Sequence, residues 1–147
     1  MVLITRPDFA FERLTREQLV ASTLLLRERG SGSRNVVETA LEKAGIKVKT
    51  FKNVIELDST EAIKSAVEAG LGVGFVSRWA IYKELELRAL QHTEVEGLRV
   101  TRPYSVVTLV GPEPSGPAGA FRAFALDRAK HLSKLPRKYL SPAASSR

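Results

Sequence analysis

The stretch DSTEAIKSAVEAGLGVGFVSRW, from Asp58 to Trp79, decides the fold of this 147-residue chain. Asp58 can cap a helix whose third position is Glu61, which is similar to a capping box. Apolar residues then recur at helical spacing on one face: Ala62, Ile63, Ala66 and Val67. Gly70 stands where helices commonly end in a left-handed conformation. The stretch therefore predicts a helix that leads directly into a strand.

The predicted strand after this helix is short and apolar, from Val73 to Val76. Gly72 and Gly74 allow neighbouring backbone to come close to it. Phe75 and Val76 are expected in the core, although Phe75 to Ser77 could also line a cleft. A helix, a glycine stop and a buried strand together form one step of an α/β sheet.

The rest of the chain repeats this alternation of strands and helices. A Thr-x-x-Gln capping box at Thr15 and Gln18 predicts a short helix to about Ala21. Short extended pieces are expected between Leu90 and Val100, with a turn at Gly97. The other expected strands or extended segments are Met1–Thr5, Thr23–Leu26, Lys47–Leu57 and Tyr104–Val110, and the other expected helices are Arg34–Ala44, Trp79–Leu87 and about Ala120–Leu132. Such alternation predicts an α/β fold with a mostly parallel sheet flanked by helices.

The composition excludes several classes of site. The chain contains no Cys, so it has no disulfide, thiolate metal site or cysteine nucleophile. Its two His residues do not favour a histidine-rich metal site. The apolar opening, Met1 to Ile4, is too short for a signal peptide or a membrane span, so a cytoplasmic location without membrane contact is expected.

The net charge of +7 is concentrated near the C-terminus. Residues 1–120 contain 16 basic and 15 acidic residues, whereas residues 121–147 contain 7 basic residues and only Asp127. A basic end can hold nucleic-acid phosphates nonspecifically, but chain ends are also where disorder collects. We expect a basic flexible tail over residues 133–147.

The loop from Gly30 to Arg34 is the best candidate for a binding site. Its residues are Gly30, Ser31, Gly32, Ser33 and Arg34. The glycines permit a sharp turn, the serines supply hydroxyls, and the N-terminus of the following helix favours a carboxylate or phosphate. Arg27 and Arg34 could add bidentate contacts to such an anion. The alternative is an ordinary connection in which Ser33 caps the helix.

A second helix start offers similar geometry at Ser59 and Thr60. Both loops would face the same edge if their strands are parallel, because ligands gather at the carboxyl ends of such strands. Capping alone also explains Asp58. His92 is expected at the surface and Trp79 as a packing anchor.

No group of residues in the sequence combines a nucleophile, a base and an oxyanion site. The glycines at 70, 72 and 74 precede a strand, so they are not a dinucleotide-binding fingerprint. We therefore expect neither an enzyme nor a cofactor.

Two stretches resemble the effector-binding domain of LysR-type transcriptional regulators. One is Asp58–Trp79, and the other is LLLRERGSGSRNVVETALEKAGI, Leu24–Ile46, with Ser33 where Thr is more usual. The resemblance implies a type 2 periplasmic-binding-protein-like lobe at about residues 12–100. It also implies that residues 1–7 and 103–132 are crossover pieces of a mostly missing first lobe, within a partial domain spanning residues 1–132. In the family the loop at Gly30 borders the effector cleft.

The resemblance implies the effector-sensing portion of a transcriptional regulator. Its partner would be a small, anionic metabolite, a carboxylate or a phosphate, and DNA would be bound only through a domain missing here. Alternatives are a stand-alone small-anion-binding domain, an enzyme on the same general fold, or a protein that pairs with full-length regulators. Without first-lobe neighbours, five apolar side chains are expected to be exposed and to cause self-association or local disorder: Val106, Val107, Leu109, Phe121 and Phe124. The expected protein partner is a second copy of the chain, in a homo-oligomer, or a full-length regulator.

Overall fold

The computed structural model describes residues 1–132, and the predicted basic tail at 133–147 lies outside these residues. The chain divides into two compact units between Arg102 and Pro103. The first unit contains all the strands of the described chain and four α-helices, whereas the second contains one α-helix. The assignment of residues 1–7 and 103–132 to another lobe stays a prediction.

A mixed sheet forms the centre of the first unit. In the described residues its strand order is β2-β6-β1-β5-β3-β4. The neighbours β3–β4, β3–β5 and β2–β6 run parallel, while β1 runs antiparallel to both β5 and β6. The strands span Val2–Thr5 (β1), Arg13–Leu14 (β2), Thr23–Arg27 (β3), Asn53–Leu57 (β4), Val73–Val76 (β5) and Gln91–Val95 (β6).

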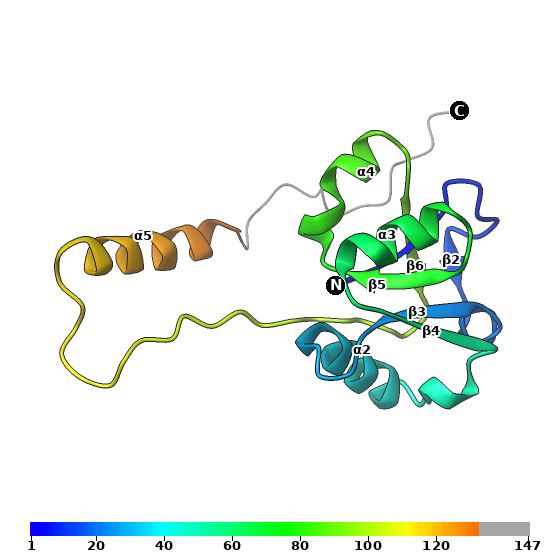
Figure 1. Cartoon of the computed structure of the whole chain (residues 1–147), viewed down its shortest axis with the longest axis horizontal. Coiled ribbons are helices and arrows are strands. Elements are labelled where there is room, and N and C mark those ends of the chain that lie inside the picture. Colours follow the sequence, from blue (N-terminus) through cyan, green and yellow to red (C-terminus); the bar gives the residue numbers. More distant parts are fainter. Residues whose placement is uncertain (133–147) are drawn as a thin grey trace. The chain divides into compact units, whose positions relative to one another are not determined.

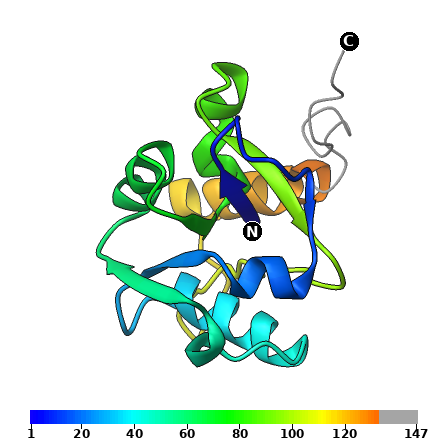
Figure 2. The ribbon, with the colours of Figure 1, turned by 90° about the vertical axis from the view of Figure 1, so that its right-hand side faces the viewer.

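Helices cover both faces of this sheet. Figures 1 and 2 show α2 and α3 on opposite sides of it. The chain reaches β4 through α2 and returns to β5 through α3, on the other side of β3. The helices of the first unit are α1 (Arg16–Val20), α2 (Gly32–Lys43), α3 (Thr60–Glu68) and α4 (Tyr82–Glu86), with 3₁₀ turns η1 (Val48–Thr50) and η2 (Arg78–Ile81).

The core has two layers, and β3 contributes to both. Leu24 and Leu26 pack on the α2 side with Leu41, whereas Leu25 packs on the α3 side with Ile63. Alternate side chains of a strand point to opposite faces, so three successive leucines supply both layers. The expected burial of Phe75 and Val76 is confirmed, because their side chains are 5% and 2% exposed.

Of the three N-cap residues considered from the sequence, the structure confirms one and corrects two. Thr15 and Gln18 form the expected reciprocal capping box at α1. The cap of α3 is Ser59, whose hydroxyl accepts from the Ala62 N–H at 3.0 Å, so the assignment of this role to Asp58 was wrong. Either side chain could cap a helix, and the start one residue later selects the serine.

The N-terminus of α2 also lies earlier than expected. The helix begins at Gly32 with Ser31 as its N-cap, so Ser33 lies inside the first turn and is not the cap. Gly30, with φ of 89°, makes the turn that precedes it. Glycine adopts this conformation at no steric cost, which allows the short loop of residues 28–31 to turn from β3 into the helix.

Gly72 and Gly74 provide the close approach that the sequence predicts. A Cβ atom added to Gly72 would lie 2.3 Å from the Thr23 carbonyl oxygen of β3, and one added to Gly74 would lie 2.6 Å from Ile63 Cγ2 of α3. The first contact is with backbone, which cannot rotate away. Gly72 therefore sets the separation between the start of β5 and the start of β3.

We expect Gly72→Ala to destabilise the chain by about 3 kcal/mol, because the added methyl group overlaps backbone. Urea unfolding followed by circular dichroism measures this change. Gly32→Ala is the matched control, since its added Cβ would meet only the Arg102 side chain, at 3.4 Å. Equal losses in the two variants would contradict the proposed overlap.

Several local expectations differ from the structure. The segment from Lys47 is extended only in part, because η1 precedes β4. The helix expected from Trp79 is divided into η2 and α4, and Trp79 is 62% exposed, so it is not a packing anchor. His92 lies in β6 and is partly buried, not at the surface. Burial, followed by the nearby Arg78 charge, lowers the pKa of His92.

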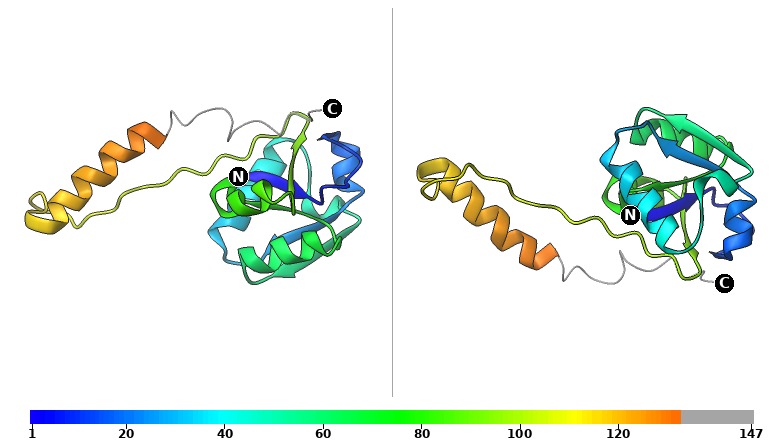
Figure 3. Two further views of the ribbon diagram at one scale, coloured as in Figure 1. Left: turned by 90° about the horizontal axis from the view of Figure 1, so that it is seen from above. Right: turned by 90° about the horizontal axis from the view of Figure 1, so that it is seen from below.

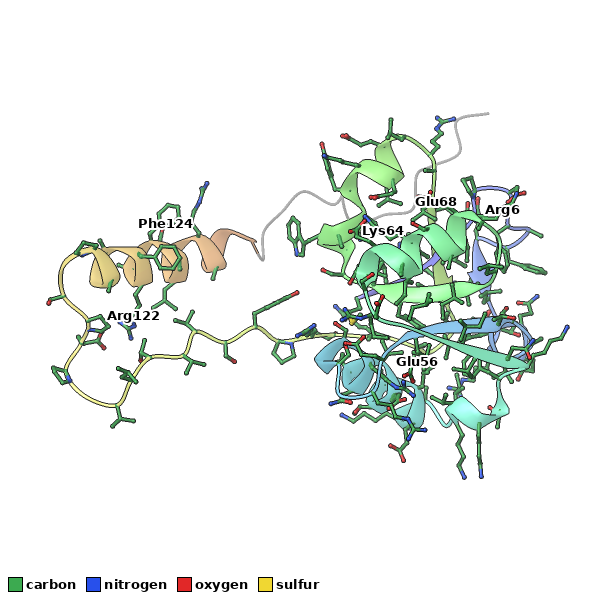
Figure 4. All side chains as sticks on the ribbon, in the orientation of Figure 1. Arg6, Glu56, Lys64, Glu68, Arg122 and Phe124 are labelled. Carbon is green, nitrogen blue, oxygen red and sulfur yellow. The ribbon has the colours of Figure 1, made fainter. Side chains whose placement is uncertain are left out.

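A buried lysine joins α3 to α4. Lys64 lies on the inner face of α3 with only 7% of its surface exposed, and Figure 4 labels it there. Its ammonium contacts Glu84 at 2.6 Å, Glu61 at 2.8 Å and the Ala80 carbonyl at 3.2 Å. Burial lowers the pKa of Lys64, but the two carboxylates outweigh this and raise it overall. The amine therefore remains charged in the fold.

The two carboxylates that bind Lys64 differ in burial, which predicts unequal contributions to stability. The Glu84 side chain is 19% exposed and the Glu61 side chain is 77% exposed. We expect Glu84→Gln to lower the free energy of unfolding by about 2 kcal/mol, because it weakens a shielded charged hydrogen bond. Glu61→Gln should change it little, since water screens that pair. Urea titrations of both variants test this, and the reverse ranking would refute it.

The second unit contains α5, Gly116–Leu132, which starts earlier than expected and continues unbroken (Figure 3). The strand expected at Tyr104–Val110 was wrong, because no strand in the described residues pairs with it. The five apolar side chains expected to be exposed are so, from Val106 at 54% to Leu109 at 95%. Among the described residues, no helix is long and apolar enough to cross a membrane.

Candidate functional site

The parallel strands bring the two predicted loops to one edge of the sheet. Because β3 and β4 are paired in parallel, their carboxyl ends lie side by side, at Arg27 and Leu57. The loop after β3 leads to α2 on one face, and the loop after β4 leads to α3 on the other. Such a reversal of direction at the carboxyl ends of strands is where α/β sheets commonly bind ligands.

Arg27 links these two loops and is itself neutralised. Its Nη1 donates to the Thr60 hydroxyl over 3.5 Å, a weak bond across the sheet edge. Its Nε and Nη2 donate to the two carboxylate oxygens of Glu28 at 2.7 and 2.9 Å. These hydrogen bonds lower the pKa of Glu28 and raise that of Arg27. The Glu28 carboxylate thus already pairs with the guanidinium that we expected to bind a ligand.

Arg34 likewise donates its hydrogen bonds to other groups of the protein. Its side chain is 12% exposed and its Nε donates to Glu38 at 2.7 Å. Its Nη1 donates to the Arg27 carbonyl at 3.0 Å and to Glu56, which Figure 4 labels on β4. The hydrogen bond with Glu38 is the main cause of its raised pKa. Arg34 therefore ties α2 to β3 and β4, and it positions the loop.

The serines of the loop are only partly buried. Ser31 and Ser33 are partly buried, whereas Gly30 and Gly32 are exposed. The N–H groups of the first turn of α2 have no acceptor within the helix, as at any helix start. Ser59 differs, because its oxygen is occupied as the cap of α3. The structure thus brings together Arg27, Thr60 and the loop, and leaves the first turn of α2 as the part of the site suited to an anion.

Sequence reasoning missed Arg102, which reaches the loop from the end of the first unit. Its Nη1 donates to the Ser33 hydroxyl at 2.7 Å. Arg102 is 69 residues away along the chain, and no local pattern indicates the contact. It also missed Glu28, Glu38 and Glu56 as partners of the two arginines, although the spacing of Arg34 and Glu38 is typical of a helical ion pair.

Comparison with known proteins identifies the family of this fold. The LysR substrate binding domain matches residues 1–130. The chain belongs to the LysR substrate binding domain family. Among curated relatives, the RuBisCO operon transcriptional regulator of Allochromatium vinosum is 36% identical over 135 residues, 90% of this chain and 44% of that protein. The regulator CbbR of Rhodospirillum rubrum is 36% identical over 125 residues, 84% of this chain and 41% of that protein.

The LysR match confirms the predicted family and fold class. The regulatory domain of CcmR from Synechocystis PCC6803, solved in complex with 2-PG, superposes with a TM-score of 0.76 at 25% identity, over 89% of this chain and 63% of that one. The chain spans less than half the length of the two curated relatives. Those relatives are transcriptional regulators, and the matching family model is that of a substrate binding domain.

Arg34 should prove to be a positioning residue. We expect Arg34→Lys to destabilise the chain by about 1 to 2 kcal/mol, because one ammonium cannot reproduce a fork shared among Glu38, Glu56 and the Arg27 carbonyl. Denaturant unfolding measures the loss. Arg29→Lys, at an exposed neighbouring position, is the control. If the two variants were equally stable, the inferred network would be refuted.

Proposed function

We propose that this LysR domain senses a small hydrophilic anion, a carboxylate or phosphate, at the first turn of α2. The observation that carries the proposal is the contact of Arg102 with Ser33 at a helix N-terminus. A guanidinium, a hydroxyl and unpaired backbone N–H groups there offer donors to one anion. The resemblance to the CcmR domain, which was solved with 2-PG, supports the same class of ligand.

Two arginines of the loop region already pair with carboxylates of the protein, which limits the groups left to bind a ligand. Arg27 and Arg34 would hold the loop in place, while Ser31, Ser33 and Arg102 would contact the ligand. The partly exposed loop suits a polar ligand more than an apolar one. In an intact regulator, an effector would control transcription only if it binds one conformation of the protein more tightly than the other. DNA binding and oligomerisation by the regulator are further parts of this proposal.

The test is a thermal melt of the 147-residue chain with 2-PG, glycolate, acetate and inorganic phosphate. A ligand at about a hundred times its Kd stabilises by about 2.7 kcal/mol, which raises Tm by several degrees. We expect a saturable rise with at least one of these anions, which Ser33→Ala and Arg102→Gln reduce strongly. Ser65→Ala, an exposed serine of α3, is the matched control and should retain the response.

Two results would contradict the proposal. One is a cooperative melt that none of the anions shifts. The other is a shift that Ser33→Ala and Arg102→Gln leave unchanged, which would place the ligand elsewhere on the chain. Circular dichroism of each variant without ligand separates a lost contact from a lost fold.

A further inference from the structure

A hollow lies along α2, beyond the loop. It is a groove of about 520 Å³ between residues 35–44, which are most of α2 and its C-cap, and residues 97–101. Small-molecule sites commonly occupy about 300 to 1,000 Å³, so the groove is of suitable size. All its lining residues belong to the first unit.

The floor of this groove is apolar and continuous with the core. Val36 and Ala40 of α2, its C-cap Ala44, and Leu98 opposite them are partly buried hydrophobic residues. They pack against the inner cluster on the α2 side of the sheet. Their remaining exposed surface faces the groove. An apolar group laid on this floor would remove that surface from water, which is favourable.

The wall opposite α2 is held in place by the fold. Gly97, with φ of 68°, turns the chain after β6, and the Leu98 N–H donates to the Val95 carbonyl at 3.2 Å. Val100, only 7% exposed, anchors the far end in the core. The groove is therefore bounded by two elements that the core fixes.

Two cations border the groove without an acidic neighbour among its lining residues. Lys43 comes from the last turn of α2, and Arg99 follows Leu98. Neither has a carboxylate partner within residues 1–132, in contrast to Arg27 and Arg34 in the loop. Unpaired positive charge beside an apolar floor favours a ligand with an anionic head and an apolar body.

We propose that this groove, lined by Val36, Ala40, Leu98, Lys43 and Arg99, binds a small amphipathic carboxylate. The apolar body would lie on the floor, and the carboxylate would lie between Lys43 and Arg99. The loop at Ser33 offers hydroxyls and N–H groups without such a floor, so the two sites would select different ligands. This inference does not depend on the effector site proposed above.

The test titrates octanoate, at monomeric concentrations, into the ¹⁵N-labelled 147-residue chain and follows amide shifts by NMR. We expect saturable shifts confined to α2 and residues 97–101. Octanol, which lacks the charge, and acetate, which lacks the apolar body, should each bind about tenfold more weakly or worse. Lys43→Gln and Arg99→Gln should each weaken octanoate binding by about tenfold. Lys49→Gln, an exposed lysine of η1 outside the groove, is the control.

Three outcomes would overturn this inference: octanol binding as tightly as octanoate, unchanged affinity in both groove variants, or shifts that fall outside the groove. Shifts confined to α5 would assign the binding to its exposed apolar side chains instead. Ser33→Ala separates the two proposed sites, because it should strongly reduce the response to a small hydrophilic anion and leave the octanoate response intact. Each proposal can thus fail without the other.

Discussion

The close approach of β5 to β3 at Gly72 is the constraint on which the first unit depends. The Thr23 carbonyl occupies the space that any side chain at Gly72 would need. With the two strands this close, β3 becomes the shared neighbour of β4 and β5, and it contributes leucines to both core layers. The order β5-β3-β4 then aligns the carboxyl ends of three parallel strands. The loops that carry Ser33 and Thr60 lie at that edge as a consequence.

Local signals in the sequence predicted much of this architecture. The capping box at Thr15 depends on residues three apart, and the left-handed glycine at Gly70, with φ of 79°, depends on one position, so both could be found without knowing the fold. Where several capping residues stand in a row, the sequence does not specify which one caps the helix. Asp58 and Ser59 illustrate this, because both are suitable and the register of α3 selects one.

Contacts between residues that are far apart in the sequence limited the prediction of the site and of one strand. The sequence shows how many arginines lie near the loop, but only the fold shows that Glu56 of β4 pairs with Arg34. It also could not place Arg102 against Ser33. The valine-rich segment at Tyr104 has the composition of a strand, yet a strand forms only where a second one can share its hydrogen bonds. Composition alone cannot supply that second strand.

The bond between Arg102 and Ser33 has a mechanical consequence. Arg102 is the last residue of the first unit, and the proline that follows restricts the backbone at the point where the chain leaves it. A change in the direction of this exit would pull on the Ser33 hydroxyl, and a change at Ser33 would release or restrain the exit. Such coupling is reciprocal in free energy. A change at either of these two residues would therefore be expected to affect the other.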